Sequence, residues 1–316
     1  MYRILISLAT LLLLQTTVFA RTATKITVDR NPDFVAVNSA TNTIYSSNST
    51  AGTVSVIDGA TNKRTATISV GGFPQGIAAN SATNQVYVAL FNGTASTVSV
   101  INGKTNAVVA SIPVSGATYV AANAATNRIY VSDSDNTVRV IDGASNTVIA
   151  TIAFSSVLEE LAIDSTRNLI YVSMVGLPPT INVIDGTTNS VINTISVTGA
   201  QFLPGLAVDP SLNQIYASDS LAMKVFVIDA TTAAVSATIA LPAGNPKYLA
   251  LGTGHQVLVS DSTVGAGRLF FINGSTRTLT GSLGLLYTPW GLAVNPVTKE
   301  IYAALSSGTF VAAIAP

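Results

Sequence analysis

The sequence contains no cysteine. This absence excludes disulfide bonds, thiolate metal sites, covalently attached haem, a lipidated cysteine anchor and a cysteine nucleophile. Exported proteins often rely on disulfides, but a chain that buries a large core does not need them. The stability of this chain must therefore come from packing.

Charged residues are also scarce. Fifteen residues are basic and 15 are acidic, together 9% of the chain, and no run of basic residues occurs. Nucleic acids and anionic membranes bind proteins largely through lysine and arginine contacts to phosphate groups. We therefore expect no nucleic-acid partner.

Histidine occurs once, as His255 in the segment from Gly252 to His255. With one histidine and no cysteine, the sequence offers no Ser-His or Cys-His nucleophilic pair and no two-histidine metal site. We predict that His255 is a surface turn residue. We expect no metal, no cofactor and no catalytic residue, which disfavours hydrolase, lyase and redox-metal chemistry alike.

Residues 1–20 contain the longest apolar run of the chain. They combine one cation, Arg3, an apolar run from Ile4 to Leu14 and a small-residue cleavage site that ends at Ala20. This pattern is typical of a secretory signal peptide, and the run is too short to span a bilayer. We predict export to the periplasm, the cell surface or the extracellular space, with no membrane span after cleavage.

The dominant feature that is present is a repeat. An Ile-Tyr or Val-Tyr pair recurs every 41 to 45 residues, with leucine in place of the tyrosine once. The positions are Tyr45, Tyr87, Tyr130, Tyr171, Tyr216, Leu258 and Tyr302. Each copy holds four short β-branched runs separated by Asn, Asp, Gly, Ser and Thr, which predicts a four-stranded antiparallel meander. The repeat predicts an all-β fold, a seven-bladed β-propeller of four-stranded antiparallel blades, in one domain over residues 21–316.

The two ends of the chain predict a closed ring. The seventh copy stops after its third run, at Pro316, so its fourth strand is missing. The segment from Thr24 to Val28 matches the fourth runs of other copies, such as the one from Thr67 to Val70. We predict that the N-terminal strand completes the last blade, which removes the exposed edges of an open sheet.

The two ends of the predicted channel differ in chemistry. Turns such as Asn38 to Asn42 and Asp58 to Asn62 repeat almost unchanged, and their Asn, Asp and Gly residues are turn-forming devices. The loops at the opposite end vary. Variable loops on a rigid scaffold commonly carry binding, so we predict a ligand site at this end, the variable mouth. Its candidate residues are Asp33, Phe34, Tyr119, Glu159, Glu160, Lys247, Tyr248 and Trp290.

Each chemical feature of the variable mouth has a structural alternative. Glu159 and Glu160 could form a catalytic pair, but consecutive residues of a regular strand face opposite sides. Serine-aspartate pairs could chelate a hard cation or cap the following loop, and we favour capping. They are Ser132-Asp133, Ser218-Asp219 and Ser260-Asp261. The four aromatic residues could stack on a ligand or plug the channel, and both interpretations stay open.

The third copy resembles the YVTN-repeat β-propellers. The similar segments are Tyr130 to Asp133, Thr137 to Asp142 and Asn146 to Ile152. That family consists of exported bacterial and archaeal proteins and includes surface-layer propellers. The resemblance covers residues 22–316 and implies the fold and export. It implies no catalytic residues, because the family shares no catalytic motif.

These observations predict a non-enzymatic exported propeller that serves the cell envelope as a binding or interaction module. Its partner would be an unidentified protein or small-molecule ligand at the variable mouth, and the chain would be a monomer or associate weakly with itself. The alternative is a metal-assisted enzyme, similar to propeller lactonases or lyases, that uses Asp and Glu at the same mouth. A third hypothesis, assembly into a surface layer, follows from the abundance of Ser, Thr, Asn and Ala.

Overall fold

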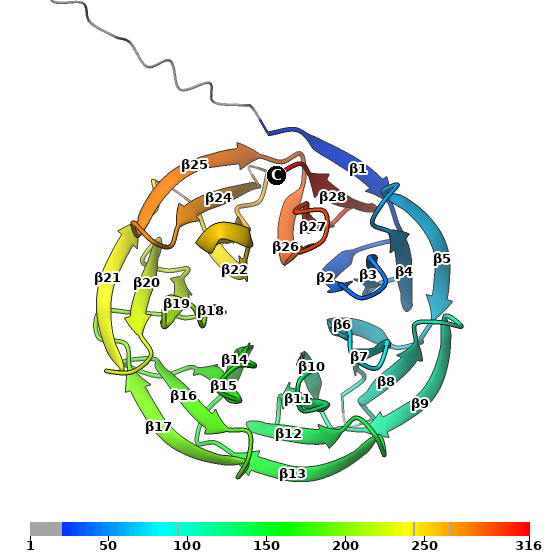
Figure 1. Ribbon diagram of the computed structural model, residues 1–316, viewed down its shortest axis with the longest axis horizontal. Coiled ribbons are helices and arrows are strands. Elements are labelled where there is room, and N and C mark those ends of the chain that lie inside the picture. Colours follow the sequence, from blue (N-terminus) through cyan, green and yellow to red (C-terminus); the bar gives the residue numbers. More distant parts are fainter. Residues whose placement is uncertain (1–20, 94, 243, 266) are drawn as a thin grey trace, which may run out of the picture.

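The computed structural model describes residues 21–93, 95–242, 244–265 and 267–316. These residues form seven four-stranded antiparallel sheets arranged in a ring around a central axis (Figure 1). The predicted seven-bladed β-propeller is thereby confirmed. The predicted signal peptide, residues 1–20, lies outside the described residues. Within the described ranges, no helix has both the length and the apolar character needed to cross a membrane.

The blades follow one another along the chain, and each runs from its innermost to its outermost strand. Blades one to three are β2 (Pro32–Asn38), β3 (Thr43–Asn48), β4 (Thr53–Asp58), β5 (Lys63–Ser69); β6 (Phe73–Asn80), β7 (Gln85–Phe91), β8 (Thr97–Asn102), β9 (Ala107–Pro113); and β10 (Ala117–Asn123), β11 (Arg128–Asp133), β12 (Thr137–Asp142), β13 (Thr147–Ala153). Blades four and five are β14 (Leu158–Asp164), β15 (Leu169–Met174), β16 (Thr180–Asp185), β17 (Ser190–Ser196); and β18 (Gly205–Asp209), β19 (Gln214–Asp219), β20 (Lys224–Asp229), β21 (Ala234–Ala240). Blade six is β22 (Pro246–Leu251), the 3-10 turn η1 (Thr253–His255), β23 (Gln256–Asp261), β24 (Arg268–Asn273) and β25 (Thr278–Gly284). Blade seven is β26 (Thr288–Val294), β27 (Ile301–Ser306), β28 (Phe310–Ile314) and the N-terminal β1 (Ala23–Thr27).

The ring closes through β1, as predicted. It pairs antiparallel with β28 in a register that joins Ala23 to Ile314 and Thr27 to Phe310. Ile26 is 3% exposed and packs in a cluster that also contains residues of blade one. One short strand therefore completes blade seven and connects it to the first blade.

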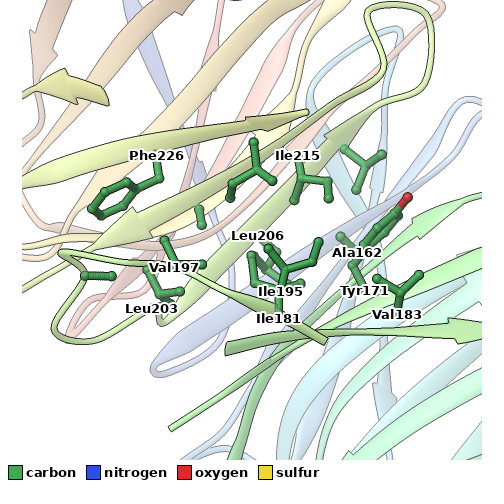
Figure 2. Packing of buried hydrophobic residues seen from close by; sticks show 14 residues of the cluster. Ala162, Tyr171, Ile181, Val183, Ile195, Val197, Leu203, Leu206, Ile215 and Phe226 are labelled. Atoms are coloured by element: carbon green, nitrogen blue, oxygen red, sulfur yellow. The ribbon is translucent and has the colours of Figure 1, made fainter. Parts of the chain in front are cut away.

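The core lies between adjacent blades rather than at the channel axis. Figure 2 shows the cluster between blades four and five, where Ile181 and Ile195 of one blade meet Leu206 and Ile215 of the next. Ile195 is the one fully buried residue of its otherwise exposed outermost strand. Burying such a side chain stabilises the fold by about 1.5–3 kcal/mol. Each sheet is thus held by its two neighbours.

The repeated tyrosines fit against the next blade. All six are nearly inaccessible to solvent. A Cβ atom added to Gly186, in the last turn of blade four, would lie 2.7 Å from the hydroxyl of Tyr130 in blade three. A Cβ atom added to Gly103 would lie 2.9 Å from the hydroxyl of Tyr45, also one blade earlier. In these two pairs the tyrosine of one blade therefore packs against the turn glycine of the next blade.

The uniform turns do more than reverse the chain. Asn38 Oδ1 accepts a hydrogen bond from the Ala40 amide at 3.1 Å, as expected of a turn device, while its Nδ2 donates to Asn84 Oδ1 of the next blade at 2.7 Å. Asn84 has a positive φ of 53°, which asparagine tolerates well. Equivalent side-chain bonds join Asn80 to Asn127, Asn123 to Asn168 and Asn295 to Asn42.

His255 takes part in this same ring of contacts. Its Nδ1 lies 2.7 Å from Asp209 Oδ2 of blade five, and 37% of its side chain is exposed. The prediction of a surface turn residue is correct, and the structure adds a contact between blades. The uniform end of the propeller is thus occupied by structural hydrogen bonds.

Candidate functional site

The innermost strands are irregular where they enter the variable mouth. In every blade except the fifth, the register against the second strand shifts at this point, as at a β-bulge. The irregular segments include Asp33, Thr118, Glu159-Glu160, Lys247-Tyr248 and Trp290-Gly291. A bulge redirects side chains that would otherwise alternate between the two faces of a strand. The strand is thus not regular at Glu159 and Glu160, so the alternation of a regular strand does not determine which way their side chains face.

Proline marks most of these irregular positions in the sequence. Pro32, Pro74, Pro246 and Pro289 each stand at the start of an inner strand, immediately before the register shift. Because proline has no N–H to donate, it is confined to strand starts, edges and bulges. This signal was available in the sequence and was missed.

Serines of the second strands stabilise the bulged backbone. Ser47 Oγ accepts a hydrogen bond from the Phe34 amide at 3.1 Å and donates to the Gln75 carbonyl of the next blade at 2.6 Å. Ser260 Oγ accepts from the Tyr248 amide at 3.0 Å. These second-strand serines, of which Ser260 belongs to a Ser-Asp pair, thus satisfy backbone groups that a regular ladder would have paired.

The aspartates of the same pairs cap loops, as we favoured. Asp133 accepts hydrogen bonds from the amide and the hydroxyl of Thr137, at 3.0 and 2.6 Å. Asp219 accepts from the amides of Leu221 and Ala222, and Asp261 accepts from the amide and the hydroxyl of Thr263, at 3.1 and 2.6 Å. Within the described ranges, no group of three or more His, Cys, Asp or Glu side chains is arranged to hold a metal ion.

Glycines lie between larger residues around the ring at this level and never occupy adjacent blades. Gly76, Gly205 and Gly291 occupy blades two, five and seven, whereas Phe34, Tyr119, Glu160 and Tyr248 occupy the others. A Cβ atom on Gly291 would approach the Phe34 ring within 2.5 Å, and one on Gly205 would collide with the Lys247 carbonyl oxygen. The small residues therefore make room for the neighbouring inner strands.

This crowding predicts that Gly205→Ala destabilises the fold by about 1–3 kcal/mol, because the new methyl group meets backbone that cannot easily move. The measurement is the midpoint of denaturant unfolding. Gly281→Ala in β25 is the matched control, since nothing lies within 4 Å of its added Cβ, and it should change stability by no more than about 0.5 kcal/mol. Equal midpoints for the two variants would contradict the close approach.

Four aromatic rings meet across the channel. The Phe34 ring lies 4.9 Å from the Tyr248 ring and 5.8 Å from the Tyr119 ring, both edge to face. The hydroxyls of Tyr119 and Tyr248 are 3.3 Å apart, and the Trp290 ring centre is 6.0 Å from that of Tyr248. These residues come from blades one, three, six and seven, which are not all neighbours in the ring (Figure 1). The cluster therefore connects inner strands of blades that are not all neighbours in the ring, and the plug and ligand-stacking interpretations both stay open.

Lys247 lies over this aromatic cluster. Its Nζ is 4.1 Å from the centre of the Trp290 ring and 5.5 Å from that of Tyr248. Burial lowers the pKa of Lys247, and the carboxylates of Glu159 and Asp33 act in the opposite direction. A cation over an indole face is attracted by the ring quadrupole. The variable mouth thus accommodates a positively charged group in contact with Trp290.

The two carboxyl groups near Lys247 are also perturbed. Burial raises the pKa of Asp33 to about 6, although a hydrogen bond with Ser49 and the charge of Lys247 oppose the shift. Burial likewise raises the pKa of Glu159, opposed by Lys247 and by a hydrogen bond with Tyr119. Asp33, Glu159 and Lys247 therefore form one electrostatically linked group.

Glu160 lines a small cavity together with the aromatic cluster. The cavity measures about 110 Å³ and is bordered by Phe34, Tyr119 and Glu160, among others. Glu160 Oε2 accepts a hydrogen bond from the Leu206 amide at 2.8 Å. Burial raises the pKa of Glu160 to about 8, against the effect of the Leu206 bond and with a further increase from Glu159. Glu160 consequently keeps its proton at neutral pH.

All eight candidate residues lie at the variable mouth, but they fall into three sets. Phe34, Tyr119, Tyr248 and Trp290 contact one another, with Lys247 over Trp290. Asp33 and Glu159 are linked to Lys247 by charge, while Glu160 faces the cavity. Glu159 and Glu160 share no side-chain hydrogen bond within the described part of the chain. The role of the eight candidate residues in ligand binding stays a prediction.

Comparison with known proteins adds support for the fold alone. Neither a protein-family model nor a curated protein matches the sequence. Among solved structures, the chain is similar to one titled Kuenenia stuttgartiensis Hydrazine Synthase, with a TM-score of 0.82 over 90% of this chain and 96% of that chain. The two sequences are 16% identical, and at that level the likeness carries the architecture and no function. Membership of the YVTN-repeat family stays a prediction.

Proposed function

We propose that this protein is an exported, non-enzymatic β-propeller that acts as a binding or interaction module of the cell envelope, with its ligand or partner at the variable mouth. The observation that supports it is the contrast between the two ends of the channel. Side-chain hydrogen bonds between blades occupy the uniform end. Aromatic and charged side chains from several blades converge at the other.

The proposal of export rests on the sequence of residues 1–20 and on the resemblance to YVTN-repeat propellers. The proposal of a non-enzymatic role rests on the single histidine and the absence of cysteine. Fold alone does not decide function. The chemistry of the mouth must therefore identify the ligand class.

That chemistry favours a ligand with an apolar body and a positively charged group. Two carboxyl groups, Asp33 and Glu159, face one ammonium group, that of Lys247. The ammonium of Lys247 already lies 4.1 Å from the indole of Trp290, in the arrangement by which aromatic residues bind ligand cations. The Lys247 ammonium thus occupies the position over Trp290 that the positively charged group of a ligand would take, and it would compete with such a ligand for this position.

Calorimetric titration with benzylamine at pH 8 tests this proposal, with benzyl alcohol and benzoate as uncharged and anionic comparisons. We expect benzylamine to bind most tightly. The double variant Asp33→Asn, Glu159→Gln and the single variant Trp290→Ala should each weaken its binding about ten-fold, equivalent to about 1.4 kcal/mol. Lys247→Met should strengthen it, because the competing ammonium is removed.

Lys104→Gln is the matched control, since Lys104 is exposed in the turn between β8 and β9 at the opposite end. Its binding should equal that of the wild type. If all three probes bind equally, or if the double variant binds benzylamine as well as the wild type does, the mouth does not recognise cations. Titrations with Ca²⁺, Mg²⁺ and Mn²⁺ address the metal-assisted alternative. Binding of one of these ions that depends on Asp33 and Glu159 would favour it.

A further inference from the structure

A second hollow lies at the point where the ring closes. Its volume is about 390 Å³, within the range of about 300–1,000 Å³ that is common for ligand pockets. It is lined by Arg30, Asn31, Thr50, Tyr287, Ser307, Gly308, Thr309 and Phe310. These residues belong to the β1–β2, β3–β4, β25–β26 and β27–β28 connections, except Phe310, which is the first residue of β28. We call it the closure cleft. It shares no residue with the aromatic cluster of the variable mouth.

Two aromatic rings form one wall of the closure cleft. The ring centres of Tyr287 and Phe310 are 5.8 Å apart, with their planes inclined by 31°. Lys25 Nζ lies 5.8 Å from the first ring centre and 5.2 Å from the second. Both aromatic residues are only half-buried. The wall therefore offers an apolar surface next to a positive charge.

The cleft carries positive charge without a compensating carboxylate. None of its lining residues is acidic. The neighbouring Asp29 is already engaged, because its two oxygens accept hydrogen bonds from Arg64 and Thr53 at 2.8 Å each. Within the described ranges, Arg30 and Lys25 form no ion pair. The local field therefore favours an anion.

The polar groups of the cleft are held by the closure of the ring. The Asn31 amide donates to the Gly308 carbonyl at 3.0 Å, and Asn31 Nδ2 donates to Thr50 Oγ1 at 2.8 Å. Ser307 has a positive φ of 65°, which is uncommon for a residue other than Gly, Asn or Asp and requires support from the surrounding structure. The walls are therefore fixed before a ligand arrives, which reduces the entropy lost on binding.

We propose that the closure cleft binds an acidic saccharide. The carboxylate of such a ligand would pair with Arg30, for which a planar guanidinium is well suited. The apolar face of a sugar ring would pack against Tyr287 and Phe310, and its hydroxyls would exchange hydrogen bonds with Ser307 and Thr309. Lys25 would add long-range attraction. This site is distinct from the variable mouth and does not depend on its ligand.

Calorimetric titration of the protein with trigalacturonic acid tests the proposal, with neutral galactotriose and tri-glutamate as comparisons. We expect trigalacturonic acid to bind at least ten-fold more tightly than either, because only it combines sugar rings with carboxylates. Monomeric galacturonate shows whether one residue suffices or a chain is required. Binding should weaken as salt increases, since part of it is electrostatic.

Variants locate the site. Arg30→Gln, at an exposed residue whose replacement should leave the fold intact, should weaken binding at least ten-fold, and Tyr287→Val should weaken it several-fold at an unchanged unfolding midpoint. Lys104→Gln and the mouth variant Trp290→Ala should bind within two-fold of the wild type. The proposal is overturned if trigalacturonic acid does not bind, if galactotriose or tri-glutamate binds equally well, or if Arg30→Gln binds as the wild type does.

Discussion

Deleting residues 21–28 is expected to destabilise the propeller and to make its unfolding less cooperative. The deletion removes β1 and exposes β28, whose residues Val311 to Ile314 are at most 2% exposed in the closed ring. It also removes Ile26 and Val28 from the core, at about 1.5–3 kcal/mol for each side chain. An open, apolar edge strand pairs readily with other chains. We therefore expect a lower denaturation midpoint, a shallower transition and aggregation in light scattering.

A chain that begins at Arg21 is the control for this deletion, since it keeps β1 intact. Ile26→Asp tests the same point with one substitution, because it places a charge where 3% of the side chain is exposed. A deleted chain that stays monomeric and unfolds at the control's midpoint would show that β1 does not close the ring.

The second large effect concerns pH. Burial raises the pKa of Glu160 from 4.5 in the unfolded chain to about 8 in the folded protein. Between these two pH values the folded protein keeps this proton, whereas the unfolded chain has released it. The free energy of unfolding is therefore unaffected by this group below pH 4.5 and decreases as the pH rises from 4.5 to about 8. At about 1.4 kcal/mol per pH unit, the loss reaches at most about 5 kcal/mol. Glu160→Gln should remove this dependence, because an amide oxygen can still accept from the Leu206 amide.

Unfolding by urea at several pH values between 4.5 and 9 measures the effect as the difference between wild type and Glu160→Gln. The difference isolates Glu160 from Asp33, whose raised pKa of about 6 acts in the same direction, and from Lys247, whose lowered pKa acts in the opposite one. Asp135→Asn, at an exposed loop position, is the matched control. A constant difference between Glu160→Gln and wild type across this range would contradict the protonated state of Glu160.

The fold could be predicted because the repeat carries its own packing rules. A tyrosine and a turn glycine recur at similar offsets, as in Tyr130 with Gly186 and Tyr45 with Gly103, because the tyrosine hydroxyl of one blade packs against the turn of the next. The match of residues 24–28 to other fourth strands likewise predicted the pairing of β1 with β28. In both cases the physical constraint is repeated along the chain, so it can be recognised without coordinates.

The candidate site was only partly predictable. The eight mouth residues share one end of the channel, which follows from their place in the repeat. Their directions depend on the register shifts of the inner strands, which the regular-strand assumption for Glu159 and Glu160 left out. The closure cleft was not predictable from local pattern. Its residues, among them Arg30, Thr50 and Tyr287, come from four connections and from the first residue of β28, and the two ends of the chain that supply them meet only because the ring closes.

The pairing of β1 with β28 also decides how the molecule responds to tension. Ala23 stands opposite Ile314, so the first and last strands leave the sheet side by side. A load applied through both ends would separate this antiparallel pair one hydrogen bond at a time rather than shearing all of them together. Strands β1 and β28 should therefore separate under small forces while the other blades remain folded.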